Sequence, residues 1–198
     1  MLDQAHPDAL RVRDPEFRVE VITEYAGWAA QLGKPGASDL LDEAYREALG
    51  LPDSAPRVGA LNRIASWLAL LDRIEEAEEI IALAAAEAGT IEDNIFKDLV
   101  LLEIVECVAG WGDYDRAEEI IELIDEPRFQ GLSLAAIALR CQEAGEEELA
   151  EEYANQAREA LAEVENPHFR ADILIRIAGS LSPGLPSPQL PEVGPPSQ

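Results

Sequence analysis

Few residues in this chain are of a type and spacing that could do chemistry. The chain has two histidines, His6 and His168, and two cysteines, Cys107 and Cys141. The histidines stand near opposite ends of the sequence, so we do not expect them to share a site. No His-x-x-x-His pair, Cys-x-x-Cys pair or glycine-rich phosphate loop occurs. The sequence therefore predicts a protein that is not an enzyme and that uses no cofactor or metal ion.

The two cysteines are too few to form a disulfide scaffold. They are typical of reduced, buried thiols in a cytosolic protein, and a redox pair is the alternative. The first residues, 1–6, lack a basic region followed by an apolar run, so no signal peptide is expected. The longest apolar run, Ile80 to Ala86, is far shorter than a membrane span. We therefore expect a cytoplasmic protein.

The charge of the chain excludes some classes of partner. The chain has 40 acidic and 15 basic side chains, which gives a formal net charge of −25. Nucleic acids and anionic membranes require clustered basic residues, so neither is an expected partner. Several runs of adjacent glutamates fall in the second helices of the later helix pairs described below. A solvated outer face explains them, and a surface for cations or basic proteins is the alternative.

A repeat organises most of the sequence, and each copy opens with a helix start. In these starts a polar or acidic residue, usually followed by proline, precedes an aromatic or apolar residue. The aligned residues, spaced by 39, 40, 33 and 40 positions, are Phe17, Pro56, Phe96, Phe129 and Phe169. A helix break follows at Gly33, Asp72, Gly112 and Gly145. Glycine serves where a helix ends in a left-handed conformation, and Asp72 departs from this pattern.

The repeat predicts an all-α fold, in which four helix-turn-helix pairs and one closing helix stack into a right-handed α-solenoid. The expected first helices cover 15–31, 55–71, 93–110 and 127–143. The expected second helices cover 38–49, 73–88, 113–124 and 147–164, and the closing helix covers 167–181. Residues 1–13 are expected to be a flexible lead-in. Residues 182–198 are rich in proline and are expected to be a disordered tail.

The turn Gly112-Asp113-Tyr114-Asp115-Arg116-Ala117, with a small residue seven positions before it, resembles the tetratricopeptide repeat family. The resemblance covers roughly residues 14–181 and rests also on the helix starts. Two features depart from the family pattern. Most repeat spacings are near forty residues, whereas the family uses about thirty-four, and Asp72 stands at one glycine position.

The resemblance implies a concave groove lined by first-helix residues off the packing stripe. Carried onto this register, those positions are Glu20, Thr23, Gly27, Gly59, Asn62, Ser66, Leu99, Leu102, Glu106, Leu132, Ala135, Leu139, Asp172, Ile175 and Gly179. From these we select the candidate partner-binding residues, which lie in the first helices of the third and fourth pairs and in the closing helix. They form an apolar strip beside one carboxylate and are Leu99, Leu102, Glu106, Leu132, Leu139 and Ile175. Such a strip would accept a basic, amphipathic segment of another protein. The alternative is that these leucines are core between repeats.

These observations leave three hypotheses for function. The first is a scaffold or adaptor that binds another protein on its concave face. The second is a homo-oligomerisation module that associates through the amino-terminal pair or the closing helix, where Ile173, Leu174 and Ile177 are apolar. The third is an enzyme or a small-ligand site. Trp28 and Trp67 occupy equivalent positions and are expected to pack between repeats.

Overall fold

The computed structural model of this chain describes residues 7, 9 and 11–180. Every regular element in these residues is an α-helix, so the expected all-α fold is confirmed. The first helices of the pairs are α2 (Pro15–Gln31), α4 (Ser54–Leu70), α6 (Asn94–Trp111) and α8 (Pro127–Ala144). The second helices are α3 (Ala37–Leu49), α5 (Ile74–Ala88), α7 (Tyr114–Ile121) and α9 (Glu147–Ala162), and α10 (Pro167–Ser180) follows them. None of these helices is long and apolar enough to cross a membrane.

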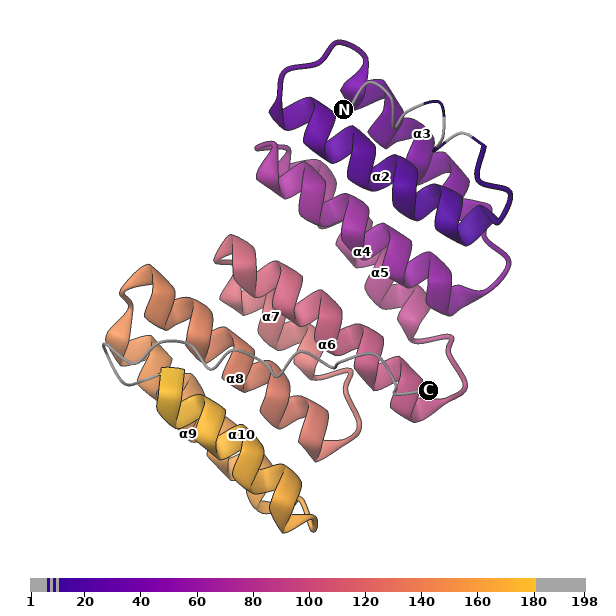
Figure 1. Cartoon of the computed structure of the whole chain (residues 1–198). Helices are drawn as coiled ribbons and strands as arrows, with labels where there is room; N and C mark the ends of the chain where they lie inside the picture. The colour runs from indigo at the N-terminus through magenta and orange to yellow at the C-terminus, as the bar shows by residue number, and fades with distance from the viewer. Residues whose placement is uncertain (1–6, 8, 10, 181–198) are drawn as a thin grey trace, which may run out of the picture.

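The helix pairs form a linear stack (Figure 1). Within each pair the two helices contact each other, as in α2 with α3 and α8 with α9. The first helices form one layer, in which α2, α4, α6, α8 and α10 contact one another in that order. The second helices lie behind this layer, and each also contacts the first helix of the next pair. The core therefore runs along the whole stack between the two layers.

One second helix is shorter than the sequence predicts. The expected helix 113–124 ends at Ile121, because the chain turns there and buries Ile124 as part of the core. This helix, α7, has 8 residues, whereas α3, α5 and α9 have 13, 15 and 16. The short helix accounts for the 33-residue spacing between Phe96 and Phe129.

The helix starts agree in part with the expected capping. The side chain of Asp14 accepts hydrogen bonds from the amides of Glu16 and Phe17, and Asp93 accepts one from the amide of Phe96. Asn166 accepts from the first amides of α10 in the same way. Glu126 precedes the first residue of α8 as expected, but its side chain makes no capping bond. Asp98 from α6 instead holds the turn just before α8, since its two carboxylate oxygens accept from the amides of Asp125 and Glu126 at 3.2 and 2.8 Å.

The turns within pairs share one backbone conformation. Gly33, Gly112 and Gly145 have φ values of 65°, 85° and 81°. Asp72 stands at the equivalent position of the second pair with a φ of 64°. The departure from glycine therefore changes the residue but not the geometry, and Asp72 bears the strain of a left-handed conformation.

The lead-in expected at 1–13 and the tail expected at 182–198 lie largely or wholly outside the described residues. In the described part of the lead-in, Ala9 is buried in the core, and the carbonyl of Val12 accepts a hydrogen bond from Arg18. These residues of the lead-in therefore contact the folded helices, and the expected flexibility of the segment stays a prediction.

Candidate partner-binding groove

A hollow of about 290 Å³ lies on the layer of first helices, between α6, α8 and α10. We call it the groove. It is lined by residues of these three helices, namely Leu102, Glu106, Leu132, Ala135, Ala136, Leu139, Arg140, Ile173 and Ile177. Seven of these nine side chains are apolar, so the groove offers hydrophobic contact, and the two charged lining residues are Glu106 and Arg140.

Helical spacing places these residues together. Leu132, Ala135 and Leu139 recur at intervals of three and four positions along α8, which puts them on one helical face. Leu102 and Glu106 lie one turn apart on α6, as do Ile173 and Ile177 on α10. Because α8 packs against both α6 and α10, its face forms the centre of the groove.

The groove contains four of the six candidate residues. Leu102, Glu106, Leu132 and Leu139 line it together. Leu139 is 38% exposed, whereas Leu102 is only 9% exposed and belongs mostly to the core. Leu99 and Ile175 do not line this hollow, although they are 39% and 69% exposed. The structure therefore brings together the middle of the expected strip and leaves its two ends outside.

The expected concave face is not a free surface along the whole stack. Thr23 is fully buried, and Gly27 is covered by the ring of Trp67. These two expected groove positions were wrong, because Thr23 lies in the buried interior and the ring of Trp67 from α4 packs on Gly27. The alternative of core between repeats therefore describes the first pair, while the α8 positions remain partly open.

The edge of the groove is electrostatically asymmetric. Glu106 lines one side, and its neighbour on α6, Glu103, has a pKa raised above its usual range, mainly by desolvation and then by the charge of Glu106. Arg140 of α8 also lines the groove and forms an ion pair with Glu143 on its own helix at 2.8 Å. A cation placed beside Glu103 and Glu106 would relieve their repulsion and lower the pKa of Glu103.

Sequence reasoning did not assign four of the lining residues to a binding site. These are Ala136, Arg140, Ile173 and Ile177. Arg140 occupies the position equivalent to Trp28 and Trp67. Aligning that position in the later repeats would have identified it. Ile173 and Ile177 were assigned to self-association, but both are buried against the stack, and Leu174 is half-buried. They therefore serve the core and the groove floor.

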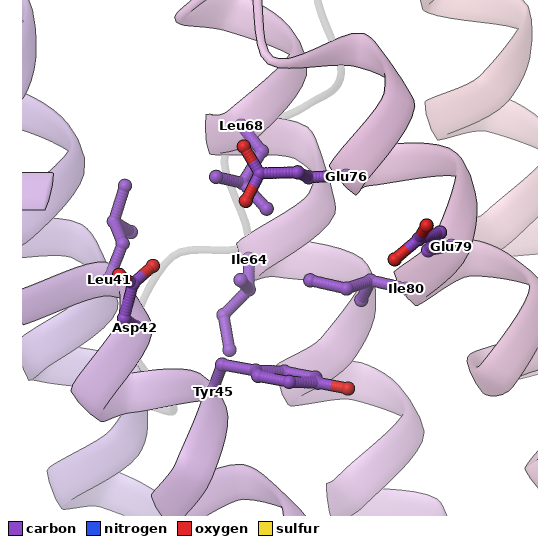
Figure 2. Close-up of a pocket in the computed structure, with 8 residues that line it drawn as sticks. All are labelled: Leu41, Asp42, Tyr45, Ile64, Leu68, Glu76, Glu79 and Ile80. Carbon is purple, nitrogen blue, oxygen red and sulfur yellow. The ribbon is translucent and has the colours of Figure 1, made fainter. Parts of the chain in front are cut away.

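A second, smaller hollow of about 110 Å³ lies between α3, α4 and α5 (Figure 2). Ile64 and Leu68 of α4 form its floor, and Asp42 and Glu76 stand on opposite sides of it. Both of these carboxylates are engaged within the chain, because Arg73 pairs with Asp42 at 3.3 Å and hydrogen-bonds to Glu76. The size of the hollow and this internal pairing make it a weaker candidate than the groove.

The cysteines are free thiols in unreactive surroundings. Cys107 Sγ lies 2.9 Å from Ser66 Oγ, and burial raises the pKa of the Cys107 thiol to about 11. Burial also raises the pKa of Cys141. A raised thiol pKa lowers the fraction of the nucleophilic thiolate, so neither position resembles an activated nucleophile. The expected burial is confirmed for Cys141, and Cys107 is half-buried.

Comparisons with known proteins support the fold and are silent on function. No protein-family model and no curated protein matched the chain. Among solved structures, the chain is similar to Ton1535 from Thermococcus onnurineus NA1, with a TM-score of 0.64 and 23% sequence identity. The match covers 89% of this chain and 53% of Ton1535, so the chain spans about half the length of that protein. At this identity the similarity shows a shared fold alone.

Proposed function

We propose that this chain is a cytoplasmic, non-enzymatic protein-binding module of the tetratricopeptide-like α-solenoid type. Its groove between α6, α8 and α10 binds a basic, amphipathic segment of another protein. Apolar side chains of that segment contact Leu132, Leu139 and the alanines between them. Basic side chains beside its apolar stripe pair with Glu103 and Glu106 on α6.

The observation that carries this proposal is the convergence of apolar side chains from three helices beside a carboxylate edge. Leu132 is half-buried and Leu139 is 38% exposed, although both stand between two packed helices. A fully packed layer would cover these side chains, as Trp67 covers Gly27 in the first pair. An apolar hollow of this kind is a common feature of sites that accept one face of a helix.

The charge of the chain supports the choice of a basic segment. A net charge of −25 attracts cations over a distance of about 10 Å at 0.1 M salt. Close to the groove, desolvation and then the charge of Glu106 raise the pKa of Glu103, while Arg63 lowers it, so an additional cation there would favour the ionised form of Glu103. A basic segment would therefore bind faster and more tightly at low ionic strength.

The experiment uses two designed helical peptides that share a leucine stripe and differ only in their flanking residues, Lys in one and Glu in the other. Fluorescence anisotropy measures their binding to the native protein and to a Leu139→Asp variant. We expect the Lys-flanked peptide to bind, and the variant to bind it at least about tenfold more weakly, since a buried apolar anchor contributes more than about 1.4 kcal/mol.

Leu123→Asp is the matched control, because Leu123 is exposed in the turn after α7, outside the groove. This variant makes the same change in charge and should bind the Lys-flanked peptide like the native protein. Equal binding of both peptides, or unchanged binding by the folded Leu139→Asp variant, would show that the groove is not the site.

A further inference from the structure

The helix at the amino-terminal end of the stack has an uncovered apolar face. Phe17, Val21, Trp28 and Leu32 are spaced by four, seven and four positions, which places them in one stripe along α2. Phe17 is 62% exposed, Trp28 is 53% exposed, and Val21 and Leu32 are also exposed. We call these four residues the α2 stripe.

In the later first helices several of the equivalent positions are buried, whereas Phe96 of α6 and Arg140 of α8, at the positions of Phe17 and Trp28, are exposed. Trp67 corresponds to Trp28 and is only 7% exposed, because its ring packs on Gly27 of α2. Cys107 stands at the same position of α6 and contacts Ser66 of α4. The positions equivalent to Val21 in α6, α8 and α10 are also buried, and they are Val100, Ser133 and Ile173. The α2 stripe therefore corresponds to the side of a first helix that faces the first helix before it.

The other end of the stack presents the second half of that contact. Ile175 of α10 is 69% exposed, whereas Thr23 and Leu102 at the equivalent positions of α2 and α6 are buried, and Asn62 and Ala135 are half-buried. Gly179 of α10 stands at the position of Gly27, the residue on which Trp67 packs. The α10 face at Ile175 is therefore open at a position where α2 and α6 are buried, and the register places a glycine one turn further along.

We propose that copies of this chain associate head to tail, with the α2 stripe of one copy packed on the α10 face of the next. Trp28 then lies over Gly179 of the neighbouring copy, as Trp67 lies over Gly27 within the chain. The contact continues the interface that already joins α2 to α4 and α8 to α10. It is heterologous, so each copy keeps one free end and the assembly extends by addition.

The charge of the copies sets the conditions for this association. Two copies that each carry a net charge of −25 repel each other, and salt screens this repulsion. A contact made mainly by one helix from each copy also falls in the small size class of interfaces, which is typical of weak association. The assembly should therefore form at high protein concentration and strengthen as salt rises. Binding of a basic segment in the groove has the opposite salt dependence.

Sedimentation velocity on the full chain, over a range of protein and NaCl concentrations, tests the proposal. We expect the native protein to grow in average mass with concentration, and more so at high salt. Trp28→Glu blocks the α2 stripe, and Ile175→Asp blocks the α10 face. Each variant alone should be a monomer, because each has lost one of the two complementary faces.

An equimolar mixture of the two variants gives the decisive result. One variant keeps an intact α10 face and the other an intact α2 stripe, so the mixture should form a complex of two chains and no larger species. A native monomer under all conditions would overturn the proposal. A mixture that stays monomeric would do so as well. Association of Ile175→Asp alone would show a symmetric contact between α2 helices instead.

Two controls separate these results from loss of folding. Leu123→Asp alters an exposed apolar residue away from both ends and should associate like the native chain. Trp28→Glu also removes the edge contact between Trp28 and Trp67, which could affect folding. Phe17→Glu changes the exposed start of the α2 stripe, keeps that contact and should have the same effect on association as Trp28→Glu. Circular dichroism confirms the fold of each variant. Peptide binding in the groove is measured separately, so either proposal can fail without the other.

Discussion

At the scale of single residues, Asp98 determines how the third pair joins the fourth. Its side chain is fully buried, and its carboxylate accepts from the amides of Asp125 and Glu126 just before α8. Lys97 Nζ lies 3.8 Å away and pairs also with Asp125. We expect Asp98→Ala to lower the free energy of unfolding by about 3 kcal/mol, because two amides would lose a charged acceptor. Urea unfolding measures this change.

Two further variants test the reason for that loss. Asp98→Asn keeps one acceptor oxygen, so it should cost less than the alanine change. Asp125→Ala removes only an exposed carboxylate and should change the stability by less than about 1 kcal/mol. If Asp98→Ala and Asp125→Ala had equal effects, the capping of the α8 entry by Asp98 would be refuted.

Asp72 is the second residue with a distinct prediction. Its φ of 64° is the left-handed conformation that glycine adopts in the other three turns. Asp72→Gly should raise the free energy of unfolding by about 0.5–1 kcal/mol, since the relief of strain exceeds the extra chain entropy of glycine. Thermal unfolding measures the gain. Gly112→Ala, at the equivalent turn, should produce a loss of similar size, and a gain from that control would contradict the reasoning.

At the scale of helices, two glycines of the first-helix layer should respond to alanine with opposite changes in stability, one through close packing and the other through helix propensity. A Cβ on Gly27 would lie 2.0 Å from the ring of Trp67, whereas a Cβ on Gly59 would meet no other heavy atom within 4 Å. Gly27→Ala should therefore cost about 1–3 kcal/mol through overpacking between α2 and α4. Gly59→Ala should instead stabilise α4 by about 0.5–1 kcal/mol. Chemical unfolding of both variants checks the opposite signs.

The helices also share a polar contact at one repeat position, the residue directly after the aligned residues Phe17, Pro56, Phe96, Phe129 and Phe169. Arg18 and Arg57 stand at equivalent positions and pair with Glu47 and Glu87, which lie near the ends of the second helices of their own pairs. Lys97 pairs with Asp125 at the corresponding place in the third pair. Gln130 and Arg170 take the same position and donate to carbonyls of the preceding turns, those of Ile124 and Val164. The polar side chain at this position thus attaches each helix of the first-helix layer either to a residue at or after the end of its own second helix or to the preceding turn.

The helices themselves could be predicted because their signals are local. Asp14, Asp93 and the turn glycines each act within a few residues of their own position, and the observed helices follow those signals. Asp98 caps residues 27 and 28 positions away, and its partners could not be inferred without the packing of α6 on α8. The same reason explains the groove, since exposure at Leu139 and burial at Thr23 depend on the size of side chains on the next helix.

At the scale of the whole molecule, the stack separates two kinds of surface. The groove lies on the first-helix layer of the carboxy-terminal half. The glutamate-rich positions belong to the second helices, where pairs such as Glu78 and Glu79 are exposed. A basic peptide could bind to the acidic second helices by charge alone, without entering the groove. The position of the bound peptide is therefore the central question.

Amide hydrogen exchange, measured with and without the Lys-flanked peptide, answers it most directly. The proposed function predicts that bound peptide slows exchange in α6, α8 and α10, and leaves α2 and α3 unchanged. The Leu139→Asp variant should lose this protection. Slower exchange confined to the second helices α5 and α9, or to the exposed stripe on α2, would contradict a partner-binding groove between α6, α8 and α10.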